Sequence, residues 1–282
     1  MRTRSAWAVL LSVLLAAAFA GGSADAQRRP RILLTDDDGI SAPGLLALYP
    51  ELARLGEVTV AAPADNQSGV GHGITYAEPI AVREIEPLVK VEGPQGKWYR
   101  IVARPATCVR LALSTLLGER PDLVVSGINR GDNVGLVVYV SGTVGAAREA
   151  AFDGLPSIAA SQAIGPGTDY KPGAAFVGRL AAEVLRRGLP RGTFLNVNFP
   201  AGGIKGVKVV PHAMTAGVNT YEKRVSPRGE TYFWNVWEEP SAPGLDTDVG
   251  AVRNGYIAVT PLSVDVNAAA AARTELEGWN LK

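Results

Sequence analysis

Short apolar runs of strand length alternate with helical patterns along most of this chain, and this alternation limits the folds that it can adopt. The expected strands are residues 31–35, 58–62, 122–126, 157–160 and 194–198. Between them, apolar residues recur every three or four positions in segments 45–55, 107–117, 143–152 and 174–187. Such alternation is typical of parallel βαβ units. We therefore predict an α/β domain with a mostly parallel sheet and flanking helices.

The first 26 residues have the pattern of a secretory signal peptide. Arg2 and Arg4 precede an apolar stretch over residues 6–20, and small residues follow it up to Ala26. The stretch is shorter than the ~20 residues that a membrane span needs. We expect cleavage before Gln27 and a periplasmic or secreted protein without a membrane span, or a cytoplasmic one if this segment is not a functional signal.

Residues 27–282 are long enough for one large α/β domain. From residue 202 the chain becomes richer in Pro, Gly and aromatic residues, with β-type runs at 232–237 and 256–260. We interpret residues 202–262 as an appended β segment or arm.

The charge balance argues against a protein that binds nucleic-acid duplexes, and the cysteine content argues against a fold held by intrachain disulfides. The chain has 28 Lys and Arg against 27 Asp and Glu, and no basic stripe that would bind a nucleic-acid duplex. Cys108 is the single cysteine of the sequence, so no intrachain disulfide is expected. Its apolar surroundings favour a buried structural thiol.

Three consecutive carboxylates, Asp36, Asp37 and Asp38, follow the first expected strand directly. Neighbouring carboxylates repel one another, so a fold that keeps them normally supplies a cation or uses one of them to carry a proton. This run makes a metal site the first functional hypothesis.

Polar loops follow other expected strands as well, and in an open α/β sheet such loops meet at one edge. They are residues 63–69, residues 126–133 and the helix start at Ser141-Gly142-Thr143. Carboxylate, hydroxyl and amide oxygens suit Mg²⁺ or Mn²⁺ rather than zinc. A helix N-terminus with free N–H groups suits a phosphate. Together these features indicate a hydrolase of phosphate esters, with metal-bound water as the nucleophile.

The chain resembles the SurE family, the survival-protein nucleotidases, from Arg31 to about Leu262. The shared motifs are Asp37-Asp38-Gly39, Ala42-Pro43-Gly44, Asn66-Gln67-Ser68-Gly69, residues 121–131, Asn133 and Ser141-Gly142-Thr143-Val144. The resemblance implies a Rossmann-like fold with a C-terminal β extension used for assembly into a homodimer or homotetramer. It also implies metal-dependent hydrolysis of nucleoside 5′- or 3′-monophosphates, often with a broader phosphomonoesterase or exopolyphosphatase range.

The resemblance also assigns roles to individual residues. The family's metal ligands fall on Asp37, Asp38, Ser68 and Asn129, and its phosphate site falls on Asn133, Ser141, Gly142 and Thr143. We expect Asp37, Asn133 and Asp36 to serve the chemistry, with Asp36 placed to act as a base.

This sequence departs from the family pattern at two positions. Asp36 replaces the usual Asn, and Leu136-Val137-Val138 occupies a region that usually carries an acidic pair. The first adds a negative charge beside the metal ligands. The second puts rate or specificity in question more than metal binding.

Alternatives remain at this point. His72 or His212 is a candidate to protonate the leaving alkoxide, and the aromatic run 231–237 is a candidate for stacking on a base. A dinucleotide-binding oxidoreductase fits the sheet pattern but not the acidic first loop, which lacks G-x-G-x-x-G. An exported protein that binds phosphate or nucleotide without hydrolysing it also fits, because the acidic pair is missing.

Overall fold

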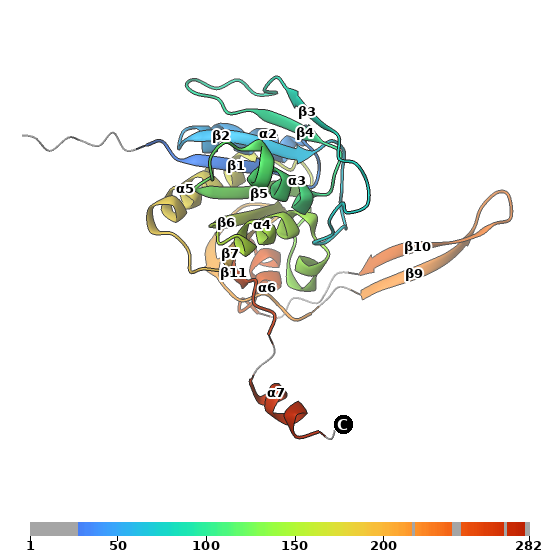
Figure 1. Ribbon diagram of the computed structural model, residues 1–282. Helices are drawn as coiled ribbons and strands as arrows, with labels where there is room; N and C mark the ends of the chain where they lie inside the picture. Colours follow the sequence, from blue (N-terminus) through green and yellow to red (C-terminus); the bar gives the residue numbers. More distant parts are fainter. Residues whose placement is uncertain (1–27, 216–217, 239–243, 268–269, 280–282) are drawn as a thin grey trace, which may run out of the picture.

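A nine-stranded sheet forms the centre of the computed structural model, which describes residues 28–215, 218–238, 244–267 and 270–279 (Figure 1). The strand order is β3-β4-β2-β1-β5-β6-β7-β11-β8. Its strands are β1 (Arg31–Thr35), β2 (Glu57–Pro63), β3 (Val82–Ile85), β4 (Trp98–Ile101), β5 (Leu123–Arg130), β6 (Ser157–Gln162), β7 (Thr193–Phe199), β8 (Gly206–Val209) and β11 (Tyr256–Ser263). Only β3–β4 and β7–β11 pair antiparallel within this sheet. The predicted α/β fold with a mostly parallel sheet is confirmed.

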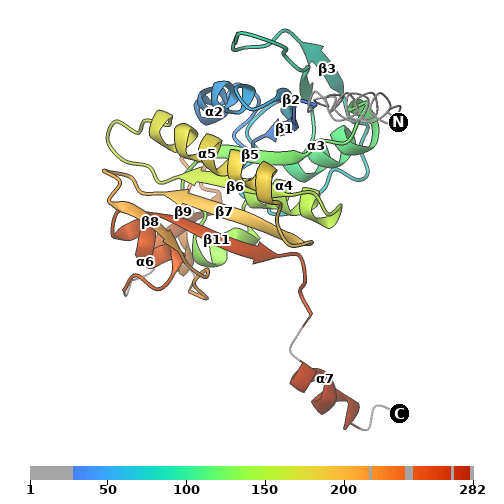
Figure 2. The ribbon, with the colours of Figure 1, turned by 90° about the vertical axis from the view of Figure 1, so that its left-hand side faces the viewer.

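Helices cover both faces of the sheet (Figure 2). The helices beside the sheet are α2 (Pro43–Ala53), α3 (Pro105–Leu111), α4 (Gly142–Phe152), α5 (Lys171–Arg187) and α6 (Asp248–Arg253). Helix α7 (Ala270–Glu277) lies apart from the sheet (Figures 1 and 2). The buried side chains of α2 and α5 belong to one hydrophobic cluster, and those of α3 belong to a cluster on the opposite face, where α4 also packs. No helix in the described ranges combines the length and the apolar character that a membrane span requires.

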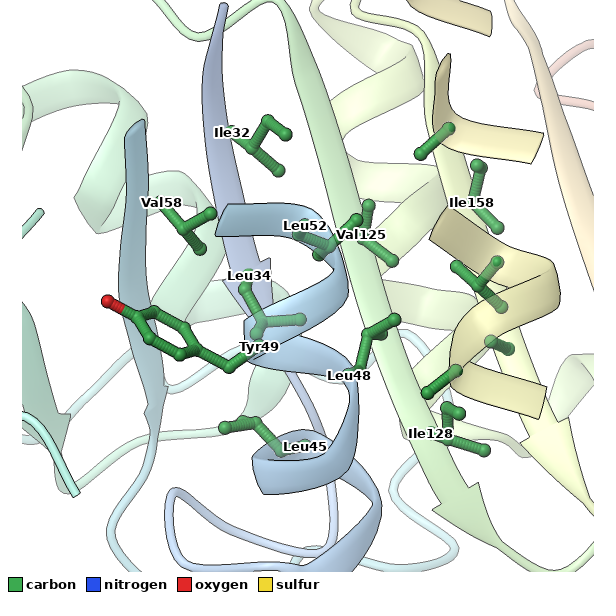
Figure 3. Close-up of a cluster of buried hydrophobic side chains, with 14 of the residues drawn as sticks. Ile32, Leu34, Leu45, Leu48, Tyr49, Leu52, Val58, Val125, Ile128 and Ile158 are labelled. Carbon is green, nitrogen blue, oxygen red and sulfur yellow. The ribbon is translucent and has the colours of Figure 1, made fainter. Parts of the chain in front are cut away.

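The larger cluster joins α2 to the centre of the sheet. Leu45, Leu48 and Leu52 lie on one side of α2 because helical spacing brings these positions together. They pack over Leu34 of β1 and Val125 of β5, which are fully buried (Figure 3). This packing holds α2 over the two strands whose ends carry the polar loops.

Local structure departs from the sequence prediction in several places. The expected helix at 107–117 begins earlier, at Pro105, and its second half is a π-helical turn, η1 (Ala112–Leu116). Strands β3 and β4 were not predicted, because the segment around them mixes polar and apolar residues without a clear period.

The C-terminal β segment divides into two parts. Strands β8 and β11 extend the main sheet, whereas β9 (Val218–Val225) and β10 (Thr231–Glu238) form a separate antiparallel hairpin. The hairpin projects away from the body of the protein (Figure 1). The predicted signal peptide lies outside the described residues.

Strand order determines where a ligand can bind. Strand β1 lies between β2 and β5, and the chain leaves β1 through α2 towards β2 but leaves β5 through α4 towards β6. The two connections therefore run in opposite directions along the sheet. In open α/β sheets, ligands bind at the carboxyl ends of strands at such a switch point.

Candidate active site

Three loops meet at the acidic run that follows β1. Asp36 and Asp37 are buried, and Asp38 is half-buried. Asp38 Oδ1 accepts a hydrogen bond from Asn66 Nδ2 at 3.0 Å, and Asp38 Oδ2 accepts one from the backbone N–H of Arg130 at 2.6 Å. The loop after β2 and the end of β5 are thus both fastened to Asp38.

The start of α4 reaches the same place. The Thr143 hydroxyl is fully buried and donates a hydrogen bond to Asp37 Oδ1. At Gly142, a Cβ atom would lie 2.9 Å from Asp37 Cβ and 2.9 Å from Asp37 Oδ2, which is closer than Cβ contacts normally come. Glycine at this position therefore lets the carboxylate lie against the first turn of the helix. The expected convergence of all four polar loops is observed.

Backbone donors are available at the first turn of α4. Ser141 caps the helix, and its Oγ accepts a hydrogen bond from the N–H of Val144 at 3.1 Å. The N–H groups of Gly142 and Thr143 lie before the first residue that can bond within the helix. An anion placed here meets these N–H groups and the positive end of the helix dipole.

Asn133 is held from several sides at the same edge of the sheet. Its N–H donates to Asn198 Oδ1 at 2.7 Å, and its Nδ2 donates to Ser161 Oγ at 2.8 Å and to Thr143 Oγ1 at 3.5 Å. Both hydrogens of its side-chain amide are thereby used within the protein. In this arrangement Asn133 supports Thr143, which in turn supports Asp37.

Three residues to which the sequence analysis assigned no role complete the site. Asn66 connects Asp38 with the N–H of Ser68, to which it is hydrogen-bonded at 2.9 Å. Asn196 and Asn198 donate to the carbonyl oxygen of Asn133 at 2.8 and 3.3 Å. Two asparagines in the otherwise apolar strand β7 were the available signal, because a fully buried amide must find a partner.

The other two expected metal ligands each keep a free oxygen. Asn129 is buried and donates from Nδ2 to the carbonyl oxygen of Gly131 at 2.6 Å, which leaves its Oδ1 as the acceptor for a ligand. Ser68 is exposed, and its hydroxyl makes no hydrogen bond within the part of the chain that the structure describes.

Burial perturbs all three carboxylates. It raises the pKa of Asp36 well above its ordinary value, and the charges of Asp37 and Asp38 add to the effect. Burial also raises the pKa of Asp37, against the hydrogen bond from Thr143, and that of Asp38, against the hydrogen bond from the Arg130 backbone. Asp36 Oδ2 is buried and has no partner among the described residues. A cation at this point would relieve both the repulsion and the desolvation.

The donor chemistry fits a hard divalent cation. Asp37 and Asp38 supply carboxylate oxygens, Ser68 a hydroxyl and Asn129 an amide oxygen, as Mg²⁺ and Mn²⁺ prefer. Within the described ranges, no group of three or more His, Cys, Asp or Glu side chains could hold a metal. The neutral oxygens are therefore needed to complete the set.

The two histidines have other partners. His72 Nε2 lies 2.7 Å from Glu149 Oε2, in the second half of α4, whereas the candidate phosphate residues lie in its first turn. The ring of His212 packs edge-on against Tyr139, with ring centroids 6.2 Å apart. No contact of either imidazole with the acidic run is observed in the described residues.

The segment that replaces the family's acidic pair has a packing role. Leu136, Val137 and Val138 lie in the 3-10 helix η2 (Gly135–Tyr139). Val138 is buried in a cluster with Val144 and Ala147 of α4. This segment therefore supports the helix that carries the candidate phosphate residues.

Comparisons with known proteins place the chain beside one family. The family described as survival protein SurE matches residues 32–219. A protein from Moorella thermoacetica named 5′-nucleotidase SurE is 45% identical over 239 residues, which cover 83% of this chain and 90% of the relative. One of the same name from Rhodopirellula baltica is 41% identical over 257 residues, or 89% of this chain and 99% of the relative. The crystal structure of the SurE protein from Aquifex aeolicus has a TM-score of 0.74 and 36% sequence identity, covering 88% of this chain and 100% of that one.

Proposed function

The chain belongs to the SurE family of survival proteins, and on that premise we propose that it is a 5′-nucleotidase. It hydrolyses nucleoside 5′-monophosphates to nucleoside and phosphate in a metal-dependent reaction, and 3′-monophosphates are candidate substrates of the same site. The relatives named 5′-nucleotidase match most of this chain and nearly all of their own length. The observation that carries the proposal is the hydrogen bond from Thr143 to Asp37, because it joins the carboxylates to the helix N-terminus.

We assign the cation to Asp37, Asp38, Ser68 and Asn129, with Mg²⁺ or Mn²⁺ as the ion. A bound divalent cation polarises the phosphoryl oxygen and lowers the pKa of a coordinated water. The protein holds these ligands in position through hydrogen bonds between the loops, such as that from Asn66 to Asp38. Such preorganisation reduces the entropy lost on binding.

The phosphate is assigned to Ser141, Gly142 and Thr143, with Asn133 beside them. The N–H groups of the first helical turn receive the non-bridging oxygens, and Asn133 keeps the Thr143 hydroxyl in place. Donors fixed in this way stabilise negative charge that develops on the phosphoryl group.

Asp36 is the candidate general base. Its Oδ2 lacks a hydrogen-bond partner within the described residues, and burial raises its pKa, which is the direction that suits a base working near neutral pH. The family usually has Asn at this position, so this role would be particular to chains that carry Asp here.

Export and self-association complete the proposal. The pattern of residues 1–26 supports a periplasmic or secreted location. The hairpin of β9 and β10 exposes Tyr221, Phe233 and Trp234, and a two-stranded hairpin is marginally stable by itself in water. We propose that a second copy of the chain covers it in a homodimer or homotetramer.

Phosphate release by the purified protein tests the function. The substrates are 5′- and 3′-nucleoside monophosphates and polyphosphate, with Mn²⁺, with Mg²⁺ and with a chelator. We expect release that requires a metal and falls at least about a hundredfold in Asp37→Asn, since the variant loses a charged ligand. Asp65→Asn is the matched control, because Asp65 lies in the loop after β2 but is exposed.

Either of two results would contradict the proposal. Equal turnover in chelator would exclude the metal dependence. Binding of nucleotide and metal without any release of phosphate would favour the non-catalytic binding protein, and would point to the replaced acidic pair at Leu136-Val137-Val138.

A further inference from the structure

We propose that His72 is a positioning residue, which fastens the loop carrying Ser68 to helix α4 and thereby sets the affinity of the site for its divalent cation. This inference rests on the proposed function, because it takes Ser68 as a metal ligand. It gives a role to a cluster of charged side chains that the proposed chemistry does not use.

The cluster connects three elements. His72 Nε2 lies 2.7 Å from Glu149 Oε2, and Arg110 Nε of α3 donates to Glu149 Oε1 at 2.7 Å. The Glu149 side chain is 8% exposed and that of His72 is 19% exposed. The imidazole also stacks on Phe152, with ring centroids 5.2 Å apart and an angle of 20° between the planes. His72 is thus held by two residues of α4.

The backbone next to His72 lies directly on the same helix. The N–H of Gly71 donates to the carbonyl oxygen of Val140 at 2.9 Å. A Cβ atom at Gly145 would be 2.6 Å from the carbonyl oxygen of Gly71 and 3.0 Å from His72 Cα, so the helix must lack a side chain there. The loop and the helix that carries the phosphate residues are therefore packed as one unit.

Ser68 lies between two fastened points of its loop. On one side, Gln67 N–H donates to the carbonyl oxygen of Asp37 at 2.7 Å, and Asn66 is bonded to Asp38. On the other side, the loop is fastened by the His72 side chain and by the N–H of Gly71. Ser68 itself is exposed, and its N–H is bonded within the loop to Asn66. Its hydroxyl can keep a fixed position relative to the carboxylates only while both sides hold.

Loss of the His72 contact weakens the attachment of one side of the loop, which then depends on the hydrogen bond from Gly71 to Val140, without breaking the fold. Glu149 keeps the hydrogen bond from Arg110, so no buried carboxylate is left without a partner. The loosened loop samples more conformations, and the cation must then order it on binding. The expected result is weaker cation binding in a protein that is still folded.

Two substitutions of His72 distinguish an amide that can reach Glu149 from one that is polar but cannot reach it. The amide nitrogen of Gln can take the place of Nε2, the atom that contacts Glu149, whereas Asn is too short and replaces only Nδ1. Arg110→Gln is the control, because it also removes one partner of Glu149 but leaves the loop attached.

The experiment is isothermal titration calorimetry of Mn²⁺ into the full-length protein, with thermal unfolding and phosphate release measured on the same samples. In His72→Asn we expect the Kd for Mn²⁺ to rise about tenfold, the cost of ordering roughly one additional residue of the loop on binding. We expect it to stay within about twofold of the unmodified protein in His72→Gln and Arg110→Gln. At saturating Mn²⁺, kcat of His72→Asn should return to near the unmodified value.

The inference is overturned if His72→Asn binds Mn²⁺ as tightly as the unmodified protein, or if Arg110→Gln weakens binding equally. It is also overturned if His72→Gln weakens binding about tenfold relative to the unmodified protein, a comparison that gives a decision even where the Asn variant fails to fold. If the unmodified protein itself binds no Mn²⁺, the proposed function fails and this inference fails with it. If the unmodified protein binds Mn²⁺ and releases phosphate, and the His72 variants bind Mn²⁺ equally well, the inference fails while the proposed function stands.

Discussion

Replacement of Thr143 by Val tests whether the link between the acidic run and α4 holds the site together. The two side chains have nearly the same shape, so packing in this fully buried position changes little. What disappears is the hydroxyl that donates to Asp37 Oδ1 and accepts from Asn133 Nδ2 at 3.5 Å. Asp37 Oδ1 is then buried without its donor.

The expected magnitude follows from these contacts. A hydrogen bond to a charged group contributes about 1.5–3 kcal/mol, and an unpaired buried acceptor costs a similar amount. For a chain of this size that corresponds to a decrease in Tm of about 3–12 °C. If the same orientation of Asp37 is needed in the transition state, kcat/KM falls by about 10- to 150-fold.

Urea or thermal unfolding in chelator measures the first effect, and phosphate release from a 5′-nucleoside monophosphate measures the second. Thr143→Ser is the matched control, since it keeps the hydroxyl and should retain most of both properties. In an Asp37→Asn background the bond has a neutral acceptor, worth about 0.5–1.5 kcal/mol, so Thr143→Val should destabilise the protein less.

The reasoning would be refuted by a Thr143→Val protein whose Tm and kcat/KM both match the unmodified values. It would also be refuted if the valine substitution destabilised the Asp37→Asn protein as much as the original one. Either result would mean that the bond to Asp37 contributes little.

Three further predictions concern acid stability, the helix start and the thiol. Burial favours a higher pKa for Glu149, but the hydrogen bonds from His72 and Arg110 outweigh burial, and the pKa of Glu149 is lowered. The stability that ionised Glu149 contributes is therefore present above its unfolded pKa of about 4.3 and is lost as the pH falls through its folded pKa. In urea titrations towards about pH 3, Glu149→Gln should lose less stability than the unmodified protein. Gly142→Ala places a Cβ 2.9 Å from Asp37 Oδ2, so phosphate release should fall at least about tenfold while circular dichroism stays unchanged, and an active variant would contradict the close contact. Burial raises the pKa of the Cys108 thiol, so a water-soluble disulfide reagent should modify it only after unfolding, and rapid labelling of the native protein would show the thiol to be accessible.

Several features of the fold could be predicted from the sequence because they depend on local periodicity. The alternation of strands and helices predicted the mostly parallel sheet, and the segment 143–152 corresponds to α4 within one residue. The split of the expected helix 107–117 and the strands β3 and β4 could not be predicted, because their residues have no clear period and neighbouring elements decide their conformation.

For the site, the sequence supplied the residue types and the tertiary structure supplied their partners. Three successive carboxylates after a strand indicated a cation site, because like charges close together require compensation whatever the fold. Which atoms provide that compensation depends on the order of the strands, which places the end of β1 between β2 and β5. The contacts of Asp38 with Asn66 and Arg130, and of Asp37 with Thr143, join residues 28 to 106 positions apart. Periodicity is a property of residues a few positions apart, so it determines elements, whereas contacts between the loops arise only when the sheet has assembled.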